Sequence, residues 1–227
     1  MIYLIMNQSI KRVVMDIKSF MDLSYEDKYI YFDKSDFMEI FLMIVGPKGT
    51  PYEDGMLFFK LNFSDKYPFE PPAVKFLNMD SKVRIHPNLY TNGKVCLSIL
   101  GTWEGPKWVL TMSLNTIALT IQSILGENPL TNEPAYYKKT LECKFCKDYL
   151  IFCIFNKYKI LLNDVLDEKF DVCKYFNKEI NEIYERNKTN LINNLLSYKE
   201  IYGNYILEKR PYYCMNTKVN FNDINLK

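Results

Sequence analysis

Four short runs of residues between positions 29 and 77 constrain the fold of this chain most strongly. The runs cover residues 29–32, 39–45, 56–63 and 73–77, and they are separated by turn residues such as Gly46-Pro47, Asp54-Gly55 and Pro71-Pro72. A periodicity near two, bounded by such residues, predicts β-strands. Parallel strands need a long, usually helical crossover, and no helical spacer lies between these runs. The sequence therefore predicts a four-stranded antiparallel meander.

Helical periodicity flanks the predicted sheet on both sides. Apolar residues recur every three or four positions in residues 6–22 and again in residues 113–125, which predicts two amphipathic helices. Helical spacing returns from residue 136 to about 207, in two or more segments, and Arg210-Pro211 then begins a polar tail that we expect to be mobile. Helices at either end of an antiparallel sheet define an α+β fold.

Composition and charge exclude several classes of protein. The 227 residues are 48% hydrophobic, enough for a domain of about 150 residues and an extension. Lys and Arg (29) nearly balance Asp and Glu (27) without forming a basic stripe, so we expect no nucleic-acid partner. The longest apolar run, residues 149–155, is too short to span a bilayer. The first residues also lack the charge order of a secretory signal. We expect no membrane partner, and a location in the cytoplasm with the nucleus as the alternative.

Six cysteines and one histidine limit the possible metal chemistry. The cysteines stand at positions 96, 143, 146, 153, 173 and 214, and the histidine is His86. Cysteines within apolar helical patterns of a chain this long predict buried free thiols. Cys143-x-x-Cys146 is compatible with half of a zinc site, but a second pair of ligands is missing. We therefore expect no metal, and a buried helix face that includes Cys143, Cys146 and Cys153.

A long loop without periodicity, residues 81–106, carries the candidate chemistry. It contains His86, Pro87 and Asn88, and Cys96 follows Asn88 by eight residues. A thiol is a nucleophile when it is exposed and partly ionised, an asparagine amide can donate to an oxyanion, and a histidine can act as base. A buried cysteine and a turn asparagine are the structural alternatives. A cysteine hydrolase that uses Cys96 and His86 is a third class, which the short separation of the two residues disfavours.

An ordered series of motifs resembles the ubiquitin-conjugating enzyme family. In chain order they are Ile10-Lys11-Arg12, Gly46-Pro47, Thr50-Pro51-Tyr52 with Gly55, residues 67–72 (YPFEPP), His86-Pro87-Asn88, residues 96–100 (CLSIL), Trp108 and Asn132-Glu133-Pro134. The resemblance covers about residues 8–137 with the motif spacing intact. Residues 92–103 and the long segment 138–227 most resemble the larger type called Z. The implied organisation is a catalytic core over residues 8–137, a helical extension over 138–210 and a tail over 211–227.

The resemblance implies an acyltransferase that carries ubiquitin, or a ubiquitin-like modifier, as a thioester on Cys96. Asn88 would donate to the developing oxyanion, and His86 would hold the loop as structural support. Ser98 stands where many relatives have an aspartate that helps an amine attack. The acidic position near the following helix falls on Asn132 or Glu133, and we favour Glu133 as the acidic helper because Pro134 then matches the family proline.

The resemblance also implies the partners, which are the modifier, an activating enzyme and a ligase, and we expect a monomer. Lys11 and Arg12 lie on the helix that meets the activating enzyme, and Phe69 matches a ligase-contact loop. Val109 and Leu110 replace the serine and proline of the second ligase loop, so they either mark a different partner or lie in the core. No cofactor is expected, because the activating enzyme consumes the ATP.

Several alternatives remain open at this stage. The chain could be a catalytically inactive ubiquitin-binding or ligase-scaffolding member, or a conjugator for a sumo-like modifier. The insert at residues 101–107, with Trp103, could gate the catalytic groove or simply cap the sheet. The C-terminal helices could extend the core rigidly, or could pack across its face and block a weak ubiquitin contact there.

Overall fold

The computed structural model describes residues 8–77, 83–203, 205 and 219–225. Residues 6–7 of the expected first helix, residues 81–82 of the expected loop, Cys214 and the tail residues 211–218 and 226–227 lie outside the described residues. The helices and strands are α1 (Gln8–Asp22), β1 (Lys28–Asp33), β2 (Asp36–Val45), β3 (Met56–Asn62), β4 (Ala73–Phe76), η1 (Ser98–Leu100), α2 (Leu114–Ile124), η2 (Pro129–Asn132), α3 (Lys144–Lys159), η3 (Ile160–Val165, a π-helix), η4 (Asp171–Tyr175), α4 (Asn177–Tyr202) and η5 (Phe221–Asp223).

The sheet confirms the predicted meander. Its strands lie in the order β1-β2-β3-β4, and each pair of neighbours is antiparallel. The turn between β2 and β3 depends on Gly46, because a Cβ atom there would lie 1.8 Å from the carbonyl oxygen of Tyr52. Only a residue without a side chain allows this close approach of two backbone segments.

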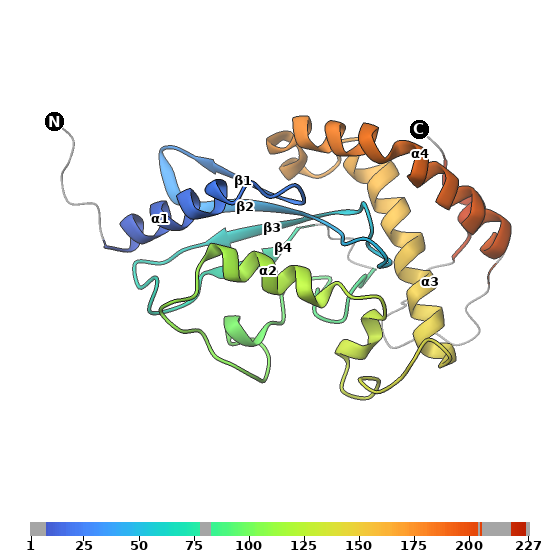
Figure 1. The fold of residues 1–227 in the computed structure, drawn as a ribbon, viewed down its shortest axis with the longest axis horizontal. Helices are drawn as coiled ribbons and strands as arrows, with labels where there is room; N and C mark the ends of the chain where they lie inside the picture. Colours follow the sequence, from blue (N-terminus) through green and yellow to red (C-terminus); the bar gives the residue numbers. More distant parts are fainter. Residues whose placement is uncertain (1–7, 78–82, 204, 206–218, 226–227) are drawn as a thin grey trace.

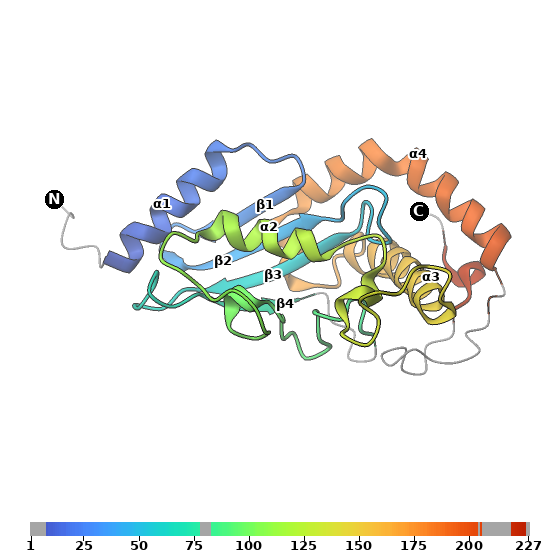
Figure 2. The ribbon, with the colours of Figure 1, turned by 60° about the horizontal axis from the view of Figure 1, so that its bottom comes forward.

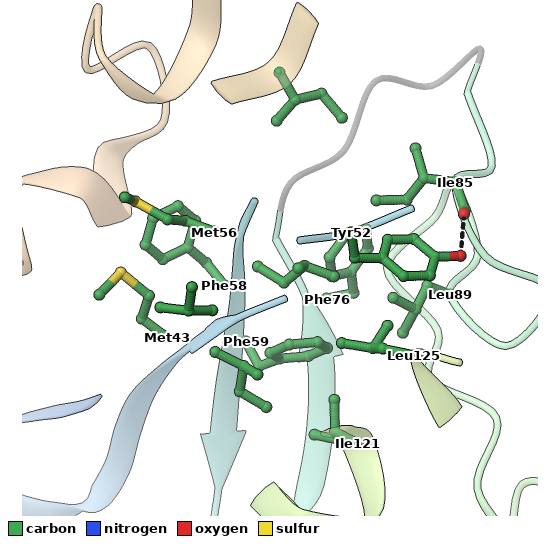
Figure 3. Packing of buried hydrophobic residues seen from close by; sticks show 14 of the residues in the cluster. Met43, Tyr52, Met56, Phe58, Phe59, Phe76, Ile85, Leu89, Ile121 and Leu125 are labelled. Atoms are coloured by element: carbon green, nitrogen blue, oxygen red, sulfur yellow. Dashed lines mark hydrogen bonds between the residues drawn. The ribbon is translucent and has the colours of Figure 1, made fainter. Parts of the chain in front are cut away.

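The inner face of the sheet packs against the two predicted amphipathic helices. Alternate residues of β2, Ile40, Leu42 and Ile44, are fully buried on this face. Phe59 of β3 lies beside Ile121 and Leu125, as Figure 3 shows. Helix α2 begins with a capping box, in which Ser113 and Thr116 satisfy each other's backbone N–H groups. The two helices therefore cover one side of the meander, and they contact each other as well.

The C-terminal extension packs across the other side. This outer face is formed by Tyr31, Phe41, Met43, Met56 and Phe58, which alternate with the inner-face residues. Met43, Met56 and Phe58 are buried and point away from α2 toward the extension (Figure 3). Tyr175 of η4 stacks on Tyr31 with ring centroids 4.3 Å apart and lies 4.7 Å from Phe41, and Phe176 lies 5.9 Å from Phe58. Packing across the face, one of the two arrangements left open by the sequence, is observed for Tyr175 of η4 and for Phe176.

Figures 1 and 2 show where the extension lies relative to the sheet. Helices α3 and α4 lie together at the end of the sheet where β2 leads into β3, on the far side of the molecule from the start of α1. The middle of helix α3, residues 149–155, is apolar on all sides, and ten residues of the helix are buried. A helix of this kind belongs to the interior of a domain rather than to its surface.

Replacing Phe176 with alanine is expected to lower the free energy of unfolding by about 3–5 kcal/mol, the usual cost of deleting a buried phenylalanine. The ring is buried and contacts Phe58, so its loss leaves a cavity between the extension and the sheet. Urea unfolding followed by circular dichroism measures the change. Tyr137→Ala is a matched control, because Tyr137 is 62% exposed and should change stability by less than about 0.5 kcal/mol. Equal effects of the two substitutions would contradict this packing.

The expectation of a polar, mobile tail is wrong for residues 219–225. Val219, Phe221 and Ile224 are all buried. Phe221 contacts the rings of Phe155 and Tyr198, and Lys199 of α4 donates to the Ile224 carbonyl at 2.7 Å. Burial of these three apolar side chains, each contributing about 1.5–3 kcal/mol, favours packing of this otherwise polar segment against the extension.

The helices of the described residues give no sign of a membrane span. None of them combines the length and the apolar composition that crossing a bilayer requires.

Candidate active site

Asn88 and Cys96 hold each other through a reciprocal pair of hydrogen bonds. The side-chain amide of Asn88 donates to the Cys96 carbonyl at 2.7 Å, and the Cys96 backbone N–H donates to the Asn88 carbonyl at 2.9 Å. A bridge between Leu89 and Val95 continues this pairing. The two residues that the sequence singled out are therefore brought together, and both are buried, Cys96 with only 1% of its surface exposed.

Thr102 fixes the loop on the other side of Cys96, a role that sequence reasoning missed. Its hydroxyl accepts the Leu97 backbone N–H at 2.9 Å and donates to the Val95 carbonyl at 2.7 Å. The backbone on both sides of the cysteine is thus held by one side chain. The only sequence signal was the position of Thr102 in the segment shared with the Z type.

His86 is fully buried and uses both ring nitrogens. Nδ1 accepts the Asn88 backbone N–H at 2.9 Å, so the proton resides on Nε2, which donates to the Ile124 carbonyl at 2.9 Å. This arrangement links the loop to the end of α2. It leaves no lone pair for the Cys96 thiol, which is what a cysteine hydrolase would need.

Burial, together with a smaller contribution from the nearby charge of Arg84, lowers the pKa of His86 from 6.5 to about 3. An unfolded chain binds a proton at this residue below about pH 6.5, whereas the folded chain does not until about pH 3. Stability is therefore fully present above pH 6.5 and declines as the pH falls toward 3.

Unfolding free energy is accordingly expected to fall by about 1.3 kcal/mol between pH 7.0 and pH 5.5. His86 is the only histidine, so no other imidazole titrates in this range. Carboxylates contribute little to the change, because their usual pKa values lie at about 4. Urea unfolding at the two pH values measures it, and His86→Gln is expected to flatten the dependence. An unchanged slope in that variant would show that another group is responsible.

Helix α3 holds residues 84–85, which lead into His86. Tyr149 donates to the Arg84 carbonyl at 2.8 Å, and the Cys153 thiol donates to the Ile85 carbonyl at 3.1 Å. Tyr52 donates to the same Ile85 carbonyl at 2.8 Å, the bond drawn in Figure 3. Residues of the extension thus position the beginning of the candidate site, a role that sequence reasoning did not assign to them.

The acidic helper considered from the sequence lies at the end of a short helix. Glu133 follows η2, and its backbone N–H donates to the Leu130 carbonyl at 2.9 Å. Asn132, the alternative, directs its side-chain amide to the Pro129 carbonyl at 3.2 Å. The two residues are partly exposed, as is Ser98 at the start of η1.

Comparison with known proteins decides the family. The family model described as "Ubiquitin-conjugating enzyme" matches residues 9–149, well over half of the chain. The chain belongs to the ubiquitin-conjugating enzyme family. Membership places it in a class of transferases that act through a cysteine thioester.

Individual relatives support the predicted resemblance to the Z type. Ubiquitin-conjugating enzyme E2 Z of Xenopus tropicalis is 42% identical over 131 residues, 57% of this chain and 42% of that protein. The Homo sapiens protein of the same name is 41% identical over 130 residues, 57% of this chain and 37% of that protein. A solved structure of human ubiquitin-conjugating enzyme E2 G1 has a TM-score of 0.46 and 27% identity, covering 53% of this chain and 97% of that one. The chain spans less than half the length of the curated relatives named here.

Two loops of this ubiquitin-conjugating enzyme chain form an exposed apolar surface. Phe69 is 67% exposed, and Val109 and Leu110 are each 51% exposed. The indole N–H of Trp108 donates to the Pro68 carbonyl at 2.7 Å, which joins the two loops. Val109 and Leu110 are therefore on the surface, which settles whether they lie in the core.

Arg12 differs from the free surface charge that its position suggests. Its guanidinium pairs with Asp16 at 2.9 Å and donates to the carbonyls of Leu110 and Met112 at 2.9 and 2.6 Å. Lys11, by contrast, is exposed. Helix α1 and the loop that carries Leu110 are consequently joined through one side chain.

The cysteines of the described residues are free thiols. In this part of the chain, no three His, Cys, Asp or Glu side chains are grouped so that they could hold a metal ion. Cys146 and Cys153 are buried on α3, whereas Cys143 precedes the helix and is half-buried.

Proposed function

We propose that the chain accepts ubiquitin, or a ubiquitin-like modifier, from an activating enzyme as a thioester on Cys96 and passes it to a lysine or to a ligase. The observation that carries this proposal is the reciprocal bonding of Asn88 and Cys96 within the family's motif. The Cys96 thiolate attacks the carbonyl carbon of the thioester on the activating enzyme, and that enzyme's thiolate leaves. Similar thiols are exchanged, so the step needs little driving force.

In the second step an amine replaces the Cys96 thiol, and the developing oxyanion needs a donor. The amide nitrogen of Asn88 has two N–H groups, and one is used by the Cys96 carbonyl. The other is available for the oxyanion. A donor of this kind typically contributes about 2.7–4 kcal/mol to transition-state stabilisation. Glu133 is our candidate for the acidic group that helps the amine lose its proton.

Charging has to uncover the thiol, because Cys96 is buried in the free chain. We propose that Lys11 and Arg12 of α1 contribute to binding the activating enzyme. Phe69, Val109 and Leu110, the exposed apolar surface of the two joined loops, would bind the ligase. Because Arg12 is bonded to the Leu110 loop, these two surfaces are adjacent.

The alternatives differ in what they predict at Cys96. An inactive scaffold forms no thioester. A conjugator for a sumo-like modifier forms one with that modifier but not with ubiquitin. A cysteine hydrolase would turn over an acyl substrate in water alone, and it is disfavoured because both His86 nitrogens are engaged.

The test incubates the full chain with ATP, ubiquitin and each available activating enzyme, followed by electrophoresis with and without reductant. A conjugate that reductant removes is the expected result. Parallel reactions with ubiquitin-like modifiers and their own activating enzymes identify which modifier is loaded. Absence of a conjugate from every combination would overturn the proposal in favour of a scaffold.

A further inference from the structure

A pair of cysteines at the start of α3 has no role in the proposed transfer reaction. Cys143 is the N-cap residue of this 16-residue helix, and its backbone is extended, with φ −66° and ψ 117°. Cys146 lies in the first helical turn, three residues later. Positions three apart lie on one side of a helix, with Cβ atoms about 5–6 Å apart, so a small adjustment at the non-helical Cys143 brings them within disulfide distance.

The two thiols differ in their surroundings and lie close enough to shift each other's pKa. Cys143 is half-buried and therefore open to a reagent from solvent, whereas Cys146 is fully buried behind it. An accessible thiol in front of a shielded one suits a two-step exchange, in which the first thiol attacks the reagent and the second then displaces it.

The helix start also activates the accessible thiol. The backbone N–H of Cys146 makes the largest contribution, and together with that of Phe145 and the charge of Lys139 it lowers the pKa of Cys143. Burial raises the pKa of Cys146. The other buried thiols of the extension are less reactive, since burial raises the pKa of Cys173 to about 11 and that of Cys153 still further. Reactivity among these helices is thus concentrated at Cys143.

We propose that Cys143 and Cys146 form a reversible disulfide, which makes the start of α3 a redox-sensitive modification site. The oxidant is a small-molecule disulfide such as oxidised glutathione. The Cys143 thiolate attacks one of its sulfurs, a mixed disulfide forms, and one glutathione thiolate leaves. Cys146 then loses its proton and attacks the Cys143 sulfur, which forms the intramolecular disulfide and releases the second glutathione. Two protein thiols are oxidised and one glutathione disulfide is reduced.

The modification site adjoins the candidate active site. Asn128, the residue before η2, donates to the Lys139 carbonyl at 3.1 Å, four residues before Cys143. Helix α3 and η2 are in contact, and η2 ends next to Glu133. A disulfide at the start of α3 therefore forms on a helix that contacts the segment leading to Glu133.

Tryptic peptide mapping of the full chain tests this proposal directly. The chain is equilibrated with mixtures of reduced and oxidised glutathione, and free thiols are then blocked. Trypsin cleaves after Lys139, Lys144 and Lys147, so Cys143 and Cys146 fall in different peptides, residues 140–144 and 145–147. We expect these two peptides to be joined in oxidised glutathione and to separate when excess reduced glutathione is added. Cys96 lies in a third peptide, so the result does not depend on the proposed transfer reaction.

Single substitutions distinguish a reversible disulfide from simple glutathione addition. Cys143→Ser is expected to remove both the link and the adduct. Cys146→Ser is expected to raise the glutathione adduct on Cys143 at least tenfold, because nothing displaces it. Cys146→Ala provides a second variant if the buried serine prevents folding, and Cys173→Ser is a control that should leave the link intact.

Three results would overturn the proposal. One is a glutathione adduct on Cys143 that is as abundant in the unaltered chain as in Cys146→Ser. Another is that both residues remain thiols when Cys96 is already modified. The third is that the reduced chain binds stoichiometric zinc through these thiols and resists oxidation, which would replace the redox site with a metal site.

Discussion

Replacement of Cys96 with alanine is expected to abolish the reductant-sensitive conjugate completely. No other described cysteine is positioned against Asn88, and the thioester bond needs the sulfur itself. Replacement with serine is more informative, because an oxygen can still take the acyl group. The Cys96→Ser chain is expected to form a conjugate that reductant does not remove, at a much lower rate. Electrophoresis with and without reductant distinguishes the two variants.

Cys173→Ala is the matched control for these substitutions. Cys173 is buried like Cys96 but lies in η4, and its loss should leave charging unchanged. Thermal unfolding of each variant shows whether the fold is intact. A conjugate that persists in Cys96→Ala and still disappears with reductant would assign the carrier role to a different cysteine.

Substitution of Asn88 is expected to slow transfer from the charged chain to a free amine by about 10²–10³-fold. Asn88→Ala removes the donor, and Asn88→Asp keeps the size of the side chain but replaces the amide with a carboxylate that cannot donate. Both variants should be slow in discharge. Single-turnover discharge of the purified conjugate to lysine measures the effect without the contribution of the activating enzyme.

Asn88 also binds the Cys96 carbonyl, so its substitution could act through the structure of the loop. The rate at which Cys96 is loaded with the modifier separates this structural role from oxyanion stabilisation. We expect the loading rate to fall much less than the discharge rate. Asn92→Ala is the control, because Asn92 is an exposed loop residue whose side chain only accepts the Lys94 N–H. An equal loss in loading and discharge would mean that Asn88 acts only by positioning the loop.

The sheet and the first two helices could be predicted because their patterns are local. Alternation in residues 39–45 and 56–63 reflects one strand each, and the hydrophobic periodicity of residues 113–125 matches the observed α2. The resemblance implied that Asn88 and Cys96 act together, but their reciprocal hydrogen bonds were not predicted, since spacing alone does not specify which backbone group an amide meets.

The rest depends on contacts between residues far apart in the chain. The sequence does not show whether the Thr102 hydroxyl faces solvent or binds the backbone of Val95 and Leu97, because a single polar residue in a loop belongs to no periodic pattern. Likewise, three apolar residues among polar ones, Val219, Phe221 and Ile224, could not be told from a mobile tail without the surface that covers them. The burial of Cys96 is also a property of the assembled loops.

The boundary at residue 149, where the family match ends, cuts through α3. Tyr149 lies on one side of that boundary and Cys153 on the other, yet the two side chains bind consecutive carbonyls, those of Arg84 and Ile85. Truncation there would leave a buried acceptor without one of its donors and an apolar helix without its second half. The segment shared with the family therefore ends inside a helix whose second half also holds the candidate active site, so the extension and the shared segment form one packed structure.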